Sequence, residues 1–336
     1  MKIINRPRHR NYRFFLSIAF FVSIFHVGNV YSAERQWKSV DVHEDETQLA
    51  KWFKERERLE QVFEYGVSIG YRKDSFSWSI GSEEIDYLSE IKWSDVKSRY
   101  LKISGAANMP NDWYVEGYYG TGAIFSGDAK DIDYSEVNRQ EVSIYSKSRA
   151  RGNADDISFS IGKRIDSDKK DSFATVLPLL GYSVHRLSFV MTEGMQVVPF
   201  ETELLGLHNF YDARWMGVWA GGEATFSPAS RFSLDVRMEV HNVNYSAKAD
   251  WNLRSDLSHP VSFRHEADGK GKVFSVKGNY ECSPHLWLSL SLAYQKWKTF
   301  PGIDTTYYSY GVEDTFVLNP INWRSHLYSI GISYRF

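Results

Sequence analysis

The sequence closes on Tyr328-Ser-Ile330-Gly-Ile332-Ser-Tyr334-Arg-Phe336, with an apolar residue at every second position. In an extended strand, successive side chains point to opposite faces, so one face here is apolar and aromatic while the other carries Ser, Gly and Arg. The first face suits lipid and the second suits a polar interior, as in a transmembrane β-barrel. The alternative is an edge strand of a soluble β-sandwich.

The amino terminus has the features of a secretory signal peptide. Five basic residues precede an apolar stretch from Phe14 to about Val27, and Ser32 and Ala33 offer a cleavage point. The stretch is shorter than the roughly 20 apolar residues that a membrane-spanning helix needs, although an uncleaved anchor is the alternative. We therefore expect residues 1–33 to be a cleaved signal peptide and the mature protein to reach the outer membrane.

The composition agrees with a barrel rather than with a helical membrane protein. The chain is 43% hydrophobic with a mean hydropathy of −0.42, yet it has 11 Trp, 21 Tyr and 21 Phe, which suits interfacial aromatic girdles. Loss of residues 1–33 changes the formal charge from −2 (40 basic, 42 acidic) to −7 (35 basic, 42 acidic). This acidic balance argues against a nucleic-acid partner. The single cysteine, Cys282, cannot form an internal disulfide.

The mature chain divides into a lead-in and one barrel domain. We expect residues 34–62 to be a periplasmic lead-in with a short amphipathic helix, a plug being the alternative, and residues 63–336 to form an all-β, ten-stranded antiparallel transmembrane β-barrel. The ten strands are predicted near 63–80, 88–108, 113–127, 139–164, 173–196, 212–225, 231–250, 271–282, 286–298 and 323–336.

The connections between these strands alternate in length. Tight ones suit the periplasmic side and long ones the outside of the cell. The tight connections are 109–112, 227–230 and 283–285, and the long ones are 197–211, 251–270 and 299–322.

Charged residues alternate with aliphatic ones in the segment that begins at Phe232. Asp235, Arg237 and Glu239 would face the lumen of a barrel, which ten strands leave narrow. We therefore expect the interior to be largely filled by side chains, so that bulk diffusion is not the default function.

Two local motifs resemble the omptins, which are outer-membrane endopeptidases with an active site in the extracellular mouth of a ten-stranded barrel. Omptins carry Asp-x-Asp-Trp after the third strand, where this chain has Asp131-Ile-Asp133-Tyr134. Their fifth strand carries Gly-Tyr, an Arg and then Ser-Phe, where this chain has Gly181-Tyr182-Ser-Val-His-Arg186-Leu-Ser188-Phe189. The order of the motifs agrees with the family over about residues 63–336.

The resemblance implies a catalytic site that this chain carries only in part. Asp131 and Asp133 would hold a water molecule, and Asp250 would orient a histidine, but the histidine position is Asn252, which has no basic nitrogen. His259 or His265, in the same predicted outer loop, would have to replace it, with Asp256 as a nearby carboxylate. The alternative is a hydrated acidic loop, with at most a weak cation site. The implied chemistry needs neither a metal nor another cofactor.

The omptin resemblance also implies lipopolysaccharide binding on the barrel exterior. The matching positions are Tyr182, Arg186 and Arg214, while an acidic position of the family motif falls on Val184. Guanidinium groups can hold lipid phosphates through paired hydrogen bonds. The alternative makes both arginines ordinary interfacial or lumenal charges.

Longer segments are similar to the Protochlamydia-type outer membrane protein family within the omptin-like group. They are Phe125-Ser-Gly-Asp-Ala-Lys-Asp-Ile-Asp133, Tyr211-Asp-Ala-Arg-Trp215 and Ala249-Asp-Trp-Asn-Leu-Arg-Ser-Asp-Leu-Ser-His-Pro260. This resemblance implies an outer-membrane barrel without establishing an enzyme. We therefore expect a structural, surface-interaction or narrow-pore role ahead of proteolysis, with outer-membrane lipid, lipopolysaccharide and the barrel-assembly machinery as partners.

Overall fold

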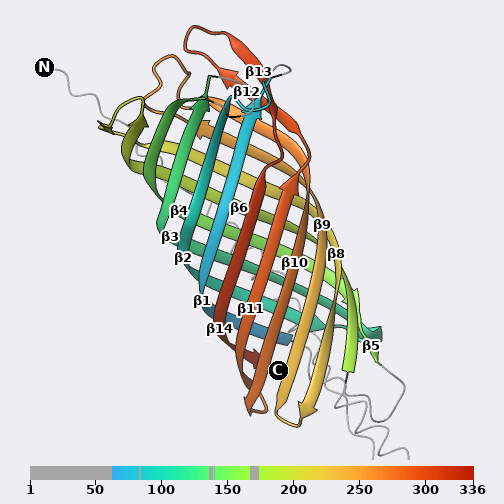
Figure 1. The fold of residues 1–336 in the computed structure, drawn as a ribbon. Coiled ribbons are helices and arrows are strands. Elements are labelled where there is room, and N and C mark those ends of the chain that lie inside the picture. Colours follow the sequence, from blue (N-terminus) through green and yellow to red (C-terminus); the bar gives the residue numbers. More distant parts are fainter. Residues whose placement is uncertain (1–62, 83–84, 136–138, 140, 167–173) are drawn as a thin grey trace, which may run out of the picture. The chain divides into compact units, whose positions relative to one another are not determined.

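The computed structural model describes residues 63–82, 85–135, 139, 141–166 and 174–336. The predicted signal peptide (1–33) and lead-in (34–62) lie outside these residues. Ten long antiparallel strands close into a ring in the order β1-β2-β3-β4-β6-β8-β9-β10-β11-β14, with β14 returning to β1 (Figure 1). Their bounds are β1 Phe63–Gly81, β2 Ser89–Asn108, β3 Trp113–Tyr134, β4 Val142–Lys163, β6 Ala174–Val198, β8 Asn209–Ala229, β9 Phe232–Asp250, β10 Phe263–Ser283, β11 Leu286–Thr299 and β14 Asn322–Arg335.

The first and last long strands close the barrel. Glu64 lies opposite Arg335, and the pairing continues without a shift to Ser77 opposite Asn322. Each long strand therefore has a partner on both sides, which removes the free edges that a lipid environment does not tolerate. The predicted terminal strand is confirmed in this position, and it ends at the same side of the barrel as the tight connections.

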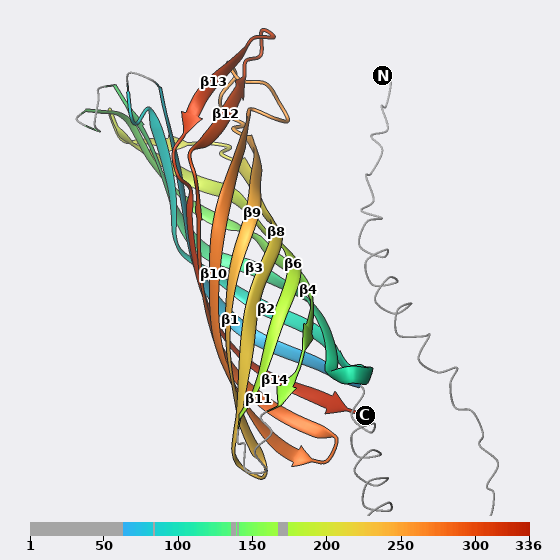
Figure 2. The ribbon, with the colours of Figure 1, turned by 90° about the vertical axis from the view of Figure 1, so that its right-hand side faces the viewer.

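Four short strands and one short 3-10 helix complete the described elements. β5 (Ile165–Asp166) and β7 (Thr202–Leu204) pair with β6, and the 3-10 helix η2 is Pro110–Asp112. β12 (Gly302–Tyr307) and β13 (Glu313–Leu318) form a hairpin that bridges β10 and β1 beyond the ends of β11 and β14 (Figures 1 and 2).

Several strands are longer at the outer end than the sequence predicted. β3 continues to Tyr134 rather than ending near 127, and β10 begins at Phe263 rather than near 271. The prediction of long connections over 251–270 and 299–322 was therefore wrong in part. The pairing of neighbouring strands continues past the apolar band, where exposed positions such as Arg264 and Glu266 are no longer apolar.

Apolar side chains form an exposed band around the end of the barrel that carries the tight connections. They alternate with lumenal residues on most strands, as expected for a lipid-facing surface. The most exposed include Ile69, Ile103, Phe159, Leu180, Val218, Met238, Leu290, Tyr328 and Ile332. Exposed basic residues follow at the outer edge of this band: Lys73, Arg99, Arg151, Arg214, Lys272, Lys296 and Arg324. Within the described part of the chain, no helix is long and apolar enough to cross a membrane.

The outer half of the interior is an apolar core. Trp93, Trp215, Trp297 and Trp323 come from four different strands and are fully buried there. The Trp297 and Trp323 rings stack with centroids 5.3 Å apart. This group of four indoles, here called the tryptophan layer, occupies the lumen where a porin would have water.

A buried ion network lies next to the tryptophan layer. The Arg72 guanidinium donates to Asp74 and to Asp156, and the Nη1 to Oδ2 distance to Asp156 is 2.7 Å. Asp156 also accepts from the Tyr100 hydroxyl at 2.6 Å, and the Trp323 indole donates to Asp74 at 2.9 Å. Such pairing is needed because an unpaired charge in a dry interior is very costly.

The tryptophan layer predicts that the barrel does not conduct ions. In a planar bilayer, repeated insertions of the wild-type protein should give no current steps. A double variant, Trp297→Ala with Trp323→Ala, removes two stacked rings and should give steps, with a stability loss of about 3–5 kcal/mol per substitution. Trp113→Ala is the control because its ring is 45% exposed on the outer surface. Steps of equal size from wild type and the double variant would contradict a closed lumen.

Candidate functional site

Two carboxylates lie side by side on one face of β3 at the outer mouth. Asp131 and Asp133 alternate with Ile132, and Asp131 lies opposite Ile91, whose side chain is fully buried in the lumen. The alternative of an acidic loop at this place does not hold, because the strand continues to Tyr134 and holds both carboxylates inward.

The environment of this pair favours protonation. Burial and, second, the charge of Asp133 raise the pKa of Asp131 to about 7. Burial also raises the pKa of Asp133, against the opposing effects of Ser89 and Arg254. Both residues lie beyond the apolar band, at the outer mouth.

An indole covers the carboxylate pair. Trp251 Nε1 donates to Asp131 Oδ2 at 3.3 Å, and the Trp251 side chain is buried against Trp78 and Phe263. Trp251 therefore occupies space directly next to the carboxylate that the omptin mechanism would use. Sequence reasoning gave Trp251 no role there, although strict alternation along β9 would have placed it on the lumenal face.

Asn252 faces a different segment. Its side-chain oxygen accepts from the His208 backbone at 2.7 Å, and its amide nitrogen donates to the Gly206 carbonyl at 2.8 Å. Its own backbone N–H donates to the Asn209 side chain at 3.0 Å. These bonds tie Asn252 to the connection before β8, and among the described residues no interaction joins it to Asp131 or Asp133.

Asp250 and His259 form the carboxylate and imidazole pair of this region. His259 Nδ1 lies 2.6 Å from Asp250 Oδ1, while Nε2 lies 3.2 Å from the Arg254 carbonyl oxygen. Both ring nitrogens therefore face oxygen atoms of this loop region, and neither has a contact with Asp131 or Asp133 among the described residues. Asp256, the other carboxylate considered for this role, instead accepts from Arg254 at 2.8 and 2.7 Å.

His265 lies inside the barrel, not in an outer loop as predicted. It is fully buried on β10, with Nε2 3.0 Å from Asp304 Oδ2 and Nδ1 2.8 Å from the Tyr211 hydroxyl. Tyr211 in turn contacts the Tyr245 hydroxyl at 2.6 Å. The alternation from Phe263 to Ala267 was the signal that could have extended the predicted strand. Among the described residues, no three His, Cys, Asp or Glu side chains gather as metal ligands.

The three residues expected to contact lipopolysaccharide share the outer surface of β6 and β8. Tyr182 is 48% exposed, and Arg186 lies directly opposite Arg214. Arg186 is held by Asp212 through two hydrogen bonds of 2.6 and 2.8 Å. Arg214 is exposed and, among the described residues, has no ion-pair partner. The structure therefore brings these three residues to one outward face.

Comparison with known proteins identifies the family of this chain and a solved structure with a similar fold. The sequence profile of the Protochlamydia outer membrane protein family (Pom) matches residues 66–336. The outer membrane protease OmpT from Escherichia coli superposes with a TM-score of 0.69 at 12% identity, covering 82% of this chain and 97% of OmpT. At this identity the likeness concerns the fold alone.

Other solved structures align less well. The translocator domain of autotransporter NalP from Neisseria meningitidis has a TM-score of 0.36 at 12% identity, covering 89% of this chain and 100% of that domain. The attachment invasion locus protein Ail of Yersinia pestis, in complex with a heparin analogue, has a TM-score of 0.31 at 11% identity, covering 82% and 99%. Among curated proteins, none matches this sequence.

The carboxylate pair predicts a pH dependence of stability. The pKa of Asp131 is about 7 in the folded protein, above its ordinary value. The protonated carboxyl therefore makes its full contribution to the free energy of unfolding below about pH 4, and this contribution is lost as the pH rises through 7. Between pH 5 and pH 8, the thermal unfolding midpoint of the wild type should therefore fall relative to that of Asp131→Asn. Asp128→Asn, at an exposed side chain of the same strand, is the control. An unchanged difference between wild type and Asp131→Asn would contradict the raised pKa.

Proposed function

The chain belongs to the Protochlamydia outer membrane protein family and is an outer-membrane β-barrel, and from this we propose that it acts as a closed, surface-exposed barrel that does not hydrolyse peptides. Its role is then structural or in surface interaction, carried by the mouth and the long outer connections. The observation that carries the proposal is the contact of the Trp251 indole with Asp131. In addition, position 252 carries an asparagine, which has no basic nitrogen.

Hydrolysis by the omptin arrangement needs a water between the carboxylates and a base that can take its proton. Here Asp131 already accepts from Trp251, and the position after Trp251 carries an amide that is bound to another loop. The remaining candidate, His259, faces acceptors with both nitrogens. No group among these has a free lone pair directed at the carboxylate pair, which supports a non-enzymatic mouth.

The filled lumen supports the same proposal over that of a diffusion pore. The core of the outer half draws side chains from all ten long strands, and the four indoles of the tryptophan layer are fully buried within it. An ordered apolar core of this kind stabilises the barrel without a membrane-crossing channel. A rigid barrel of this type is a suitable base for the loops that contact the outside.

An endopeptidase with a rearranged site is the second candidate. It is favoured by the pKa of about 7 at Asp131, which suits proton transfer near neutral pH, and by the 2.6 Å pair of Asp250 and His259. In that mechanism Asp131 and Asp133 would hold the water, and His259 would have to leave the Arg254 carbonyl to act as a base.

A peptide-cleavage experiment separates the two candidates. Refolded protein with lipopolysaccharide should leave a mixed peptide library intact, because no base faces the carboxylate pair. The readout is mass spectrometry of the peptides after prolonged incubation. Asp131→Ala is compared with Asp128→Ala, a matched change on the same strand. Cleavage by wild type and by Asp128→Ala, lost in Asp131→Ala, would establish the endopeptidase instead.

We further propose that lipopolysaccharide binds to the exterior around Tyr182, Arg186 and Arg214. Arg214 supplies an exposed guanidinium at the outer edge of the apolar band, and Tyr182 supplies an aromatic ring within that band. Arg186 is held in place by Asp212, which orients it and also reduces its free charge. A lipopolysaccharide molecule fits this arrangement when its phosphate lies near Arg214 at the band edge and its acyl chains lie along the apolar band beside Tyr182.

Arg214→Ala should weaken lipopolysaccharide binding by roughly tenfold, because a charge-assisted hydrogen bond is lost. Arg324→Ala is the matched control, since Arg324 is exposed at the edge of the same band on β14. Binding is measured by the retention of lipopolysaccharide on the detergent-purified protein. Equal losses in the two variants would mean that the exterior attracts anionic lipid without a site at β6 and β8.

A further inference from the structure

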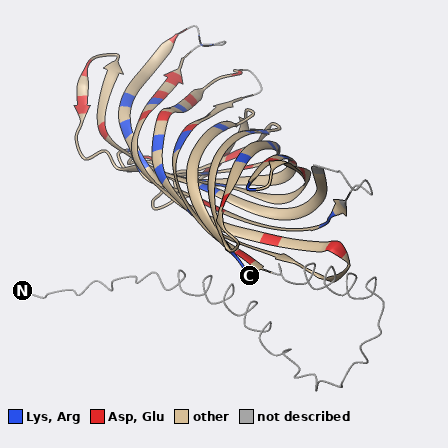
Figure 3. Ribbon diagram, turned by 90° about the horizontal axis from the view of Figure 1, so that it is seen from below, with Lys and Arg blue, Asp and Glu red and all other residues tan. Residues whose placement is uncertain are grey.

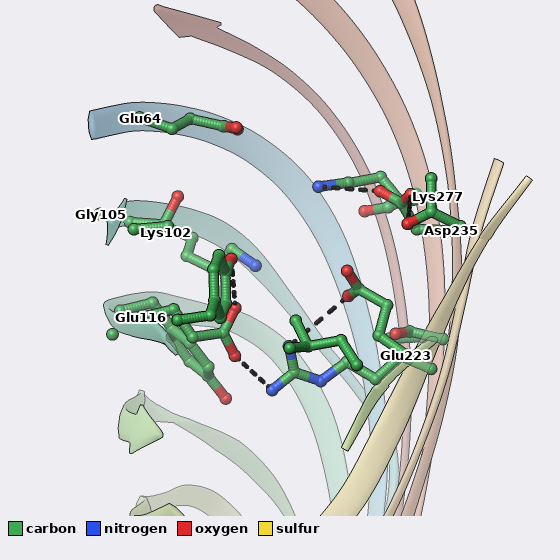
Figure 4. Close-up of a pocket in the computed structure, with 18 of the residues that line it drawn as sticks. Glu64, Lys102, Gly105, Glu116, Glu223, Asp235 and Lys277 are labelled. Atoms are coloured by element: carbon green, nitrogen blue, oxygen red, sulfur yellow. Dashed lines mark hydrogen bonds and ion pairs between the residues drawn. The ribbon is translucent and has the colours of Figure 1, made fainter. Parts of the chain in front are cut away.

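The inner half of the lumen contains a polar cavity that the outer mouth does not use. It has a volume of about 440 Å³, within the range of small-molecule sites, and side chains of both charges line it (Figure 4). Small residues such as Ser104, Ser291 and Ser329 leave the space open. Acidic and basic positions are interspersed on neighbouring strands of the barrel wall (Figure 3).

Most of the charges that line the cavity are already paired with one another. Arg237 on β9 contacts Glu116 on β3 across the lumen and Glu239 on its own strand, and Glu116 also accepts from Ser160 at 2.9 Å. Lys277 lies 3.3 Å from Asp235, which accepts two further hydrogen bonds from Thr225 and Asn279. At the opening, Arg335 donates to Glu64 at 2.8 Å. These groups need no ligand, because each already has a close partner of opposite charge.

Two charges of opposite sign are less completely paired. Lys102 on β2 has no carboxylate within 4.0 Å among the described residues, and its ammonium lies 4.9 Å from the Tyr118 ring centroid. Glu223 on β8 has one long ion pair, with Arg237 Nη1 at 3.7 Å, and it shares this guanidinium with Glu116 and Glu239. Figure 4 shows the two side chains entering the same space from opposite walls.

One N–H donor of the lining lacks an acceptor. The indole nitrogen of Trp287 is buried and has no hydrogen-bond acceptor. Trp287 lies on β11 at the level of Ser104, which is one lumenal step from Lys102 according to the strand register. An N–H donor and an ammonium therefore lie on adjoining walls, and a carboxylate on the wall opposite.

The cavity lies at the end of the barrel that carries the tight connections, because Asn108 and Ser227 are among the residues that line it. We expect this end to face the periplasm. At its inner limit, Tyr100 donates to Asp156, and Gln295 accepts from the Trp297 indole at 3.2 Å, so that the cavity ends at the tryptophan layer. A ligand from the cell exterior would have to displace the apolar core. The occupant must therefore be a solute of the periplasm.

We propose that this cavity binds a small periplasmic zwitterion of the amino acid or short peptide class. Its carboxylate pairs with Lys102 and accepts from Trp287, and its ammonium pairs with Glu223. A ligand with separated charges of opposite sign gives hydrogen-bond partners to all three groups, whereas a simple anion would leave Glu223 with its long ion pair alone and a simple cation would leave Lys102 unpaired. The site lies apart from the outer mouth, so it stands whether or not the protein hydrolyses peptides.

The test uses the full mature chain, refolded in a non-ionic detergent, and isothermal titration with three probes. Triglycine carries both charges, N-acetyl-triglycine lacks the ammonium, and triglycine amide lacks the carboxylate. We expect saturable 1:1 binding of triglycine, weakened roughly tenfold or more by either blocking group, because each removes one charge-assisted hydrogen bond.

Two conservative variants assign the charges. Lys102→Gln should abolish the preference for the free carboxylate while keeping that for the free ammonium, and Glu223→Gln should do the reverse. Lys248→Gln, at an exposed position on β9, is the control. Heat-modifiable mobility on gels reports whether each variant is folded. Absence of saturable triglycine binding, equal binding of the blocked probes, or the same loss in both variants would overturn the proposal.

Discussion

Closure of the hydrogen-bonded ring is the constraint on which the rest of the structure depends. A strand in lipid cannot leave its backbone groups unpaired, so β1 must meet β14 along its length, from Glu64 with Arg335 to Ser77 with Asn322. Closure fixes the register of every strand between them, and it separates an outer apolar surface from an inner space. The positions of the lumenal side chains follow from this single pairing.

The interior is divided into three levels by the polarity of those side chains. Next to the outer mouth lies an apolar core with the tryptophan layer, then the buried network around Arg72, and then the cavity with Lys102 and Glu223. Burial explains the network, because a guanidinium in this position needs both Asp74 and Asp156 as partners. The same requirement makes the incomplete pairing of Lys102 and Glu223 in the cavity informative.

The mouth illustrates how one barrel fold can support different chemistry. The ring superposes on that of an outer membrane protease, yet the groups at the mouth differ: Trp251 contacts Asp131, Asn252 is bonded to a neighbouring loop, and His259 contacts acceptors on both sides. A fold therefore does not carry its relatives' activity with it. The arrangement of a few side chains at the strand ends decides the function, and here it favours a surface role.

The sequence by itself determined the fold class, because alternation with a period of two is a local property that any strand shows in isolation. It also located the charged lumenal face of Asp235, Arg237 and Glu239, which form the predicted interior contacts. It left open where each strand ends, since outer extensions such as that of β10 are fixed by pairing with distant strands.

Only the tertiary structure decided the site. Asp131 and Trp251 are 120 positions apart, and whether their side chains meet depends on the register of the five ring strands from β3 to β9. The burial of His265 against Asp304 and Tyr211 is a contact of the same kind. Alternation shows which face a side chain occupies, whereas only closure of the ring sets its height and its neighbours across the lumen.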